Sequence, residues 1–327
     1  MVEEESNESV EKYKKSLSFS KIVKVTGDKP DEFYQSEFKR LPKYKRGSRD
    51  SKGSGFRPLE SEFEIPEFYV KIHSKSEDDA LGKLGCVDVK RILKTQYVSE
   101  KYSGSSDEPS EVTVDIFWIR EHDLMLMNGP KKLCSNAFDE IINLGTLNLK
   151  EIKFVHDFLM WIPYRLNIAN GELYPELFVT IIADGVTQNK SSTGFVPKKI
   201  SIDKSIEALM ALPSIYGLVN QHKFYLIGGD FKFRSKFLKV KLSNDGIHIK
   251  INNTLKNKDH GERCAIVFPF IIEMVNVLKY WKGLNAKERY PDEQFLKYLE
   301  DTFDEQVKEC KDNFKKLRED YKKRRNS

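Results

Sequence analysis

Basic and aromatic side chains are interspersed between Lys39 and Pro58. These residue types are suited to binding nucleic acid. Six of the cations in this segment are candidate contacts: Lys43, Lys45, Arg46, Arg49, Lys52 and Arg57. They could pair with phosphates, and the rings of Tyr44 and Phe56 could stack on nucleic-acid bases. Because the segment is also rich in Gly and Ser, we predict a flexible basic arm, although a solvated linker would share this composition.

A second group of basic residues lies within the strand-like stretch between residues 231 and 251. Its members are Lys232, Arg234, Lys236, Lys239, Lys241 and Lys250, and the phenylalanines among them are Phe231, Phe233 and Phe237. Alternation along a strand places Lys239 and Lys241 on one face, opposite the apolar residues that flank them. This composition is typical of a sheet surface that binds single-stranded nucleic acid, but any half-buried antiparallel strand has the same pattern.

A weaker candidate is an anion-binding site at Gly129-Pro130-Lys131-Lys132, between a predicted strand and a predicted helix. Backbone N–H groups at a helix start and the side chains of Lys131 and Lys132 could hold a phosphate. A proline at a helix start also has an ordinary structural role. The sequence contains neither GxxxxGK[ST] nor GxGxxG, so we predict no nucleotide cofactor.

Residues suited to enzymatic catalysis are scattered along the chain. His122, His156 and His260 each lie close to an acidic residue, but the sequence has no HExxH, GxSxG or CxxC motif. We therefore predict no catalytic residue, no metal site and no cofactor, and we favour a non-enzymatic protein. The remaining catalytic alternative is a metal-dependent nuclease, whose carboxylates would be sought at Asp184 and Asp230.

The overall charge is small, so local clusters of charge must decide any argument about binding. Charged residues make up 32% of the 327 residues, yet the net charge is only +5. Residues 308–325 hold nine Lys or Arg and four acids, a surplus equal to the net charge of the whole chain. Apolar residues, at 39%, are enough to build a core without disulfides or metals, which excludes wholesale disorder.

Cysteine spacing and the N-terminus indicate the compartment. Cys86, Cys134, Cys264 and Cys310 are far apart in the sequence, which favours reduced thiols in the cytoplasm, or in the nucleus of a eukaryotic cell. The acidic start at residues 3–5 does not fit a signal peptide, and no run of 18 apolar residues occurs. We expect neither secretion nor a membrane partner.

Two hairpin-then-helix modules are expected to position the basic residues. The first has strands at 112–119 and 124–127 and a helix at 131–144; the second has strands at 237–242 and 247–251, joined by Ser243-Asn244-Asp245-Gly246, and a helix at 270–281. Their shared order predicts an α+β fold in which an antiparallel sheet has its helices gathered on one face.

Further elements are expected around these modules. Strands are predicted at 21–25, 68–72, 87–93, 177–183 and 224–227, and helices at 148–162 and 205–212. The helix at 148–162 would begin with Asn148-x-x-Glu151, which resembles a capping box, and Pro163 would kink or end it.

The resulting division of the chain has five parts. These are a disordered tail at 1–20, a strand with the basic flexible arm at 21–61, α+β modules at 62–200 and 201–290, and a basic amphipathic helix at 291–327.

Apolar residues recur every three or four positions along the last helix and give it one apolar side. They are Phe295, Leu299, Phe303, Val307, Cys310, Phe314, Leu317 and Tyr321. Through residues 292–325 this side could form a coiled coil with a second copy or dock a partner, or it could fold back on the chain's own body.

Together these patterns predict a nucleic-acid-binding protein that contacts DNA or RNA mainly through phosphates and with little sequence preference. The first alternative is a protein interaction or assembly module that uses the terminal helix. The metal-dependent nuclease is the third.

Overall fold

The computed structural model describes residues 16–27, 36–58, 92–103, 108–189, 197–203, 208 and 210–326, which belong to two compact units. Unit 1 comprises Met1–Lys153 and Asp245–Asn276, and unit 2 comprises Phe154–Asn244 and Val277–Ser327. Both units combine helices with antiparallel strands, so the predicted α+β class is confirmed. The chain passes between the units three times, whereas the sequence suggested boundaries near residues 20, 61, 200 and 290.

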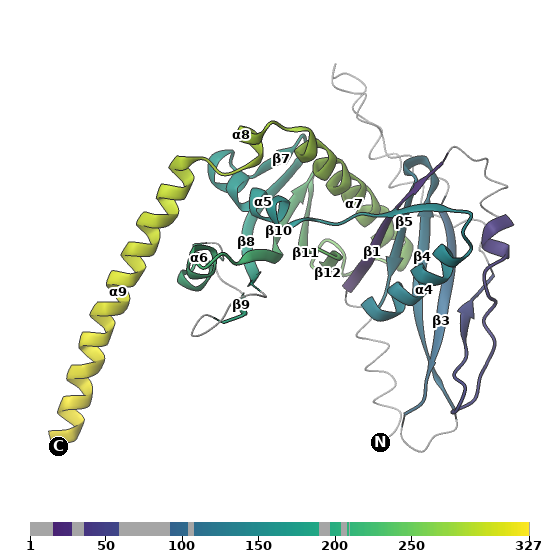
Figure 1. The fold of residues 1–327 in the computed structure, drawn as a ribbon, viewed down its shortest axis with the longest axis horizontal. Coiled ribbons are helices and arrows are strands. Elements are labelled where there is room, and N and C mark those ends of the chain that lie inside the picture. The colour runs from purple at the N-terminus through teal and green to yellow at the C-terminus, as the bar shows by residue number, and fades with distance from the viewer. Residues whose placement is uncertain are drawn as a thin grey trace. The chain divides into compact units, whose positions relative to one another are not determined.

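The sheet of unit 1 has the strand order β2-β3-β4-β5-β1-β12, and β6 also pairs with β1. Its strands are β1 (Ser16–Thr26), β2 (Ser54–Phe56), β3 (Ile92–Lys101), β4 (Ser110–Ile119), β5 (Leu124–Asn128), β6 (Asn148–Glu151) and β12 (Gly246–Lys250). Strands β4 and β5 form the predicted hairpin, which closes through the short 3-10 helix Arg120–His122 and through Asp123 at φ 50°. Strand β1 pairs with both β5 and β12, so segments far apart in the sequence share one sheet (Figure 1).

Strand β1 begins at Ser16, although the sequence predicted disorder up to residue 20. Leu17 and Phe19 are 4% and 0% exposed, and they lie opposite Ile249 and Ile247 of β12. Burial of these two side chains supplies stabilisation that composition alone did not reveal. The rest of the predicted tail, residues 1–15, lies outside the described residues.

Helices cover both faces of the unit 1 sheet, where the sequence suggested a single face. Helix α4 (Lys131–Asn143) lies across the near face in Figure 1 and shares a core with Ile116 and Trp118 of β4. On the other face, Phe268 of α7 (His260–Gly283) contacts the ring of Phe117. Because residues 116–119 are all buried, this end of β4 is apolar on both faces and can accept a helix on each.

The sheet of unit 2 has the order β11-β10-β8-β7, and β9 pairs with β8. Its strands are β7 (Glu172–Tyr174), β8 (Leu177–Gln188), β9 (Lys199–Ile202), β10 (Lys223–Phe233) and β11 (Lys236–Ser243), and its helices are α5 (His156–Ile168), α6 (Leu212–Val219), α8 (Ala286–Arg289) and α9 (Glu293–Asn326). An aromatic cluster supports it, in which Phe158 of α5 stacks on Trp161 and meets Trp281 edge-on. The predicted turn at Ser243-Asn244-Asp245-Gly246 lies where the chain passes from unit 2 to unit 1.

The predicted helix at 148–162 is wrong at its start. Residues 148–151 form β6, which pairs with residues 23–26 of β1, and α5 then begins at His156 and continues through Pro163. An ion pair of 2.7 Å between Lys21 and Glu151 adds to this pairing. A capping-box pattern is a local signal, and tertiary pairing overrides it here.

Strands β8 and β10 extend farther than predicted, because glycines that resembled strand ends lie inside them. Gly228 of β10 lies opposite Asp184 of β8, and a Cβ at Gly229 would lie 1.9 Å from the carbonyl oxygen of Ile181. These glycines therefore let neighbouring strands approach at an irregularity in the pairing.

Helix α7 begins at His260 rather than near Phe270. Asp259 and Glu262 form a capping box: the Asp259 carboxylate accepts from the Glu262 N–H at 2.7 Å, and the Glu262 carboxylate accepts from the Asp259 N–H at 3.0 Å. By length and composition α7 could cross a membrane, but 78% of its most apolar window is buried, as in a core helix.

Helix α9 confirms the predicted terminal helix, and its apolar side has two different parts. Phe295 and Leu299 are 1% and 6% exposed, whereas Phe314 and Tyr321 are 66% and 58% exposed. The predicted strand at 68–72 and residues 87–91 of the predicted strand at 87–93 lie outside the described residues, and residues 92 and 93 begin β3. Of the predicted helix at 205–212 only residues 208 and 210–212 are described, and α6 begins at Leu212.

Candidate nucleic-acid interface

Residues 43–53 form a closed loop around the carboxylate of Glu100, where the sequence suggested a flexible arm. Glu100 lies near the end of β3 and is 4% exposed. Its Oε2 accepts a hydrogen bond from the Gly53 N–H at 2.7 Å, and both of its oxygens accept from the Gly47 N–H at 3.1 Å. We call residues 43–53 the basic loop; its backbone is fixed by hydrogen bonds.

Two tyrosine hydroxyls complete the environment of Glu100. Tyr44 donates to the carboxylate at 2.9 Å and Tyr102 at 3.3 Å. Burial opposes ionisation, but the backbone and hydroxyl donors outweigh it and hold the pKa of Glu100 below its ordinary value. Desolvation and the hydrogen bond to Glu100 raise the pKa of Tyr44 to about 12. The loop thus encloses a carboxylate anion.

Two glycines allow the two sides of the basic loop to approach each other closely. A Cβ at Gly53 would lie 2.2 Å from the carbonyl oxygen of Lys45, and a Cβ at Gly47 would lie 2.1 Å from that of Ser51. The Ser48 N–H donates to the same Ser51 oxygen at 2.8 Å and closes the tip. Larger residues would force the backbone apart at both positions.

The cations of the basic loop lie on its outside. Lys43, Lys45, Arg46, Arg49 and Lys52 are all exposed. The same residues 43–53 contain one acid, Asp50. A dense positive charge on a fixed backbone is well suited to a phosphate chain.

Of the two aromatic rings that were predicted to stack on bases, one is buried and the other is half-buried. Phe56 is 3% exposed and packs edge-on against Tyr97, so its ring cannot stack on a base. Tyr44 is half-buried, with its hydroxyl bound to Glu100. Arg57 lies beyond the loop, where it donates to Glu111 at 2.5 Å and to the Gln96 side chain at 2.8 Å.

In unit 2, the exposed side of β8, β10 and β11 carries three of the six cations of the second predicted group: Lys232, Lys239 and Lys241. We call Phe178, Ile181, Asp230, Lys232, Phe237, Lys239 and Lys241 the sheet face. As predicted, Lys239 is exposed while Leu238 and Val240 are buried. Lys232 lies between Phe178 and Phe237 in the strand register, and Phe237 is 52% exposed.

Acidic side chains neutralise much of the positive charge near the sheet face. Lys241 forms ion pairs with Asp184 at 2.7 Å and with Asp203 at 3.7 Å. Lys239 lies opposite Asp230 in the register. This surface is therefore more balanced in charge than its lysines suggested.

The remaining predicted residues are dispersed. Arg234, in the turn after β10, is paired with Glu176 at 3.1 Å, and Lys236 is half-buried at the start of β11. Lys250 is exposed on β12, in unit 1, so it belongs to a different unit from the other members of its group.

The weak anion site at the start of α4 already contains a carboxylate. Lys131 is paired with Asp245 at 2.5 Å, and Lys132 is exposed on the helix. A phosphate at this position would compete with Asp245 for Lys131.

Glu100 is the residue of this candidate site that could not be found from the sequence. In the sequence it is one of several acids near a loop, and nothing local distinguishes it. The available signal was the pair Gly47 and Gly53, because closely spaced glycines in a basic segment indicate a tight loop that needs an internal acceptor.

Among the described residues no three His, Cys, Asp or Glu side chains lie together in an arrangement that could hold a metal ion. Asp184, one of the carboxylates considered for a nuclease, is 8% exposed and paired with Lys241. His156 bonds through Nδ1 to the carbonyl oxygen of Phe224 at 2.5 Å, as expected of a histidine at the edge of a core.

No protein-family model matches the chain, and a comparison with curated proteins finds none with significant sequence similarity.

Proposed function

We propose that the protein binds nucleic acid through its phosphate backbone, with the basic loop as the main contact. The observation that carries this proposal is the set of five exposed cations on a loop whose backbone Glu100 fixes. A loop that is ordered before binding loses little conformational entropy when phosphates arrive. Contacts to phosphate carry no base sequence, so we expect binding to be tolerant of sequence.

The sheet face of unit 2 supports a lesser contact. Phe237 is half-exposed beside Lys232, and an aromatic ring next to a lysine can stack on a base while the cation meets a phosphate. The ion pairs of Lys241 and the position of Asp230 opposite Lys239 reduce the positive potential there. We therefore assign the larger electrostatic share to the basic loop.

The test compares two variants with equal loss of charge. One replaces Lys45, Arg46 and Arg49 with glutamine in the basic loop, and its matched control replaces Lys232, Lys236 and Lys239 with glutamine in unit 2. Fluorescence anisotropy with labelled single-stranded and double-stranded oligonucleotides, measured over a range of salt concentrations, gives affinities and salt slopes.

The native chain should bind with an affinity that falls steeply as salt rises. The loop variant should bind about 10-fold more weakly at about 100 mM salt, with a salt slope reduced by about 2 to 3. The control should stay within about 3-fold of the native affinity. Binding that is absent, insensitive to salt, or equally weakened in both variants would contradict the proposal.

A second candidate function is self-association through the exposed half of α9. From Val307 onward the apolar residues are spaced by three, four, three and four positions, at Val307, Cys310, Phe314, Leu317 and Tyr321. This is the heptad spacing of a left-handed coiled coil. In a parallel pair Asp320 would face Arg325 of the second copy across the seam, a favourable contact.

Sedimentation equilibrium tests this second candidate. The native chain should show a mass that rises toward that of a dimer with concentration, and replacement of Phe314 and Leu317 by serine should leave a monomer. Replacement of Lys315 and Lys316 by serine, on the outer side of the same helix, is the matched control and should leave the mass unchanged. A native chain that remains monomeric throughout would exclude self-association.

A further inference from the structure

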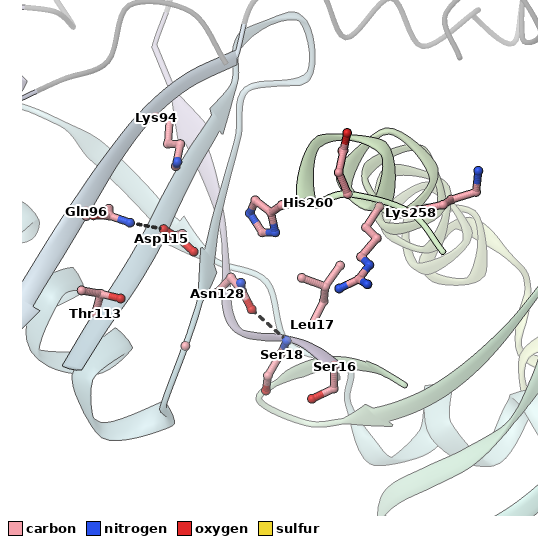
Figure 2. A pocket seen from close by; sticks show the side chains of 13 residues that line it. Ser16, Leu17, Ser18, Lys94, Gln96, Thr113, Asp115, Asn128, Lys258 and His260 are labelled. Carbon is pink, nitrogen blue, oxygen red and sulfur yellow. Dashed lines mark hydrogen bonds between the residues drawn. The ribbon is translucent and has the colours of Figure 1, made fainter. Parts of the chain in front are cut away.

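Unit 1 contains a polar cavity of about 740 Å³ between its strands and the N-terminal end of α7 (Figure 2). The side chains that matter here come from β3, β4 and the segment 258–263: Lys94, Gln96, Asp115, Lys258, His260 and Arg263. Pockets of roughly 300 to 1,000 Å³ hold ligands of the size of a drug or a cofactor fragment. The cavity is therefore large enough for a small metabolite.

Polar side chains line this cavity next to an apolar part of the same sheet face. Phe117, two residues beyond Asp115 on the same face of β4, packs against Phe268 of α7. Next to this contact, Gln96 of β3 lies opposite Asp115 of β4. Gln96 and Asp115 are half-buried at the cavity, and hydrogen-bonding groups in such a position suit this stretch to a polar ligand.

A chain of hydrogen bonds fixes the orientation of the polar wall. Arg57 donates to Gln96 Oε1 at 2.8 Å, and Gln96 Nε2 donates to Asp115 Oδ1 at 2.7 Å. The Gln96 amide is thereby held in one orientation, and the Asp115 carboxylate is held at the cavity wall. Lys94 and Asp115 extend from the strands toward the His260 ring at the start of α7 (Figure 2).

The charge that lines the cavity is positive on balance. Lys94, Lys258 and Arg263 are the cations, and Asp115 and Asp259 are the acids. The Asp259 carboxylate caps α7 by accepting from a backbone N–H at 2.7 Å, so it already serves the helix. Three cations from two sides of the cavity, near the positive end of a helix dipole, favour an anion. Arg263 also donates to the carbonyl oxygens of Leu255 at 3.1 Å and of Lys256 at 3.4 Å, so part of its donor capacity is already used.

We propose that this cavity binds a small phosphate monoester, with the phosphate held by Lys94, Lys258 and Arg263 and with a hydroxyl or amino group of its organic part donating to Asp115. Both sugar phosphates and nucleoside monophosphates have this chemistry. The inference does not rest on the nucleic-acid proposal, because the lining residues do not include any from the basic loop.

The thiol beside His260 is not activated as a nucleophile. Cys264 lies one turn after His260, with 3.8 Å between its sulfur and the His260 Nε2. Burial raises the pKa of the Cys264 thiol, so it stays protonated. Partial burial lowers the pKa of His260, and the Asp115 carboxylate opposes this shift. Near neutral pH, His260 is thus mainly a neutral hydrogen-bonding group.

Isothermal titration calorimetry with AMP, ribose 5-phosphate and inorganic phosphate tests the proposal on the full chain. The native protein should bind at least one of the two esters saturably. Lys94→Gln should weaken that binding about 10-fold or more. Lys101→Gln, at the exposed end of the same strand, is the matched control and should change it by less than about 2-fold. Which ester binds more tightly identifies the organic part.

Asp115→Asn sharpens the assignment, because Gln96 can still donate to the asparagine oxygen and the wall stays in place. This variant should weaken the preferred ester while leaving any affinity for inorganic phosphate unchanged. Circular dichroism melts of each variant establish that it is folded. Absence of saturable binding for all three probes, or equal losses in the Lys94 and Lys101 variants, would overturn the proposal. The loop variant should bind the ester as the native chain does, which separates the two proposals.

Discussion

The basic loop of unit 1 and the sheet face of unit 2 carry their cations in opposite ways. In the loop the structural anion is internal: Glu100 is bound by backbone N–H groups and tyrosine hydroxyls, and the lysines and arginines are exposed. In the sheet the acids lie on neighbouring strands, and Lys241 pairs with Asp184 directly. A basic segment can bind phosphate when other donors hold its nearby acids, so that its cations are not paired with them. The number of lysines alone does not decide this.

The largest expected effect comes from removing the internal anion. Glu100→Gln keeps the size of the side chain but removes the charge that four donors share, so the basic loop should open. We expect the melting temperature to fall by on the order of 10 °C. Differential scanning calorimetry provides the measurement.

Asp139→Asn, at an exposed carboxylate on α4 of the same unit, is the control and should melt within about 2 °C of the native chain. If Glu100→Gln melted like this control, the basic loop would not depend on Glu100.

The second-largest effect is expected at Gly53, where the backbone on the two sides of the basic loop approaches closely. In Gly53→Ala the new methyl group would meet the Lys45 carbonyl oxygen at 2.2 Å, and backbone must shift to relieve it. We expect a loss of about 2 kcal/mol in the free energy of unfolding, measured by urea denaturation. Gly283→Ala has nothing within 4 Å of the added methyl and should change stability by less than about 1 kcal/mol. Equal losses in both variants would show that the loop is not tightly packed.

A smaller effect distinguishes the lysines of the sheet face. Lys241→Met removes the ion pair with the buried Asp184, so the free energy of unfolding should fall by about 1 to 2 kcal/mol. Lys239→Met, on the same strand and exposed, should change it by less than about 0.5 kcal/mol. If the two variants were equally stable, the ion pairs would not explain why the sheet face differs from the loop.

The smallest expected effect is the pH dependence of the stabilisation that Glu100 provides. Because its folded pKa lies below the ordinary value of 4.5, ionised Glu100 stabilises the fold above that pH, and this stabilisation is lost as pH falls through the folded pKa. The difference in melting temperature between the native chain and Glu100→Gln should therefore narrow by a few degrees between about pH 7 and pH 3.5. A constant difference over this range would mean that another group is responsible.

Much of the architecture could be predicted from local pattern, and the rest depended on distant contacts. The hairpin of β4 and β5, helix α4 and helix α9 follow from alternation, a turn and apolar spacing, which are local signals. The strand at Asn148 and the early start of β1 could not be predicted, because each depends on pairing with a strand more than 100 residues away.

The candidate site shows the same limit. The exposed cations of the basic loop were visible in the sequence, but the loop's order was not, because Glu100 lies about 50 residues away. The polar cavity was missed for a similar reason. Asp115 was one polar residue within the predicted strand at 112–119, and Lys94 lay just beyond the predicted strand at 87–93. Only the pairing of β3 with β4 brings them together.

Photo-crosslinking to an oligonucleotide that carries 4-thiouridine tests most directly whether the basic loop is the nucleic-acid contact. Digestion and mass spectrometry of the crosslinked protein would locate the attached peptides. Crosslinks concentrated in residues 39–58, and lost at raised salt, are the predicted result. Crosslinks concentrated at Phe178 and Phe237 of the sheet face, with none in residues 39–58, would contradict it.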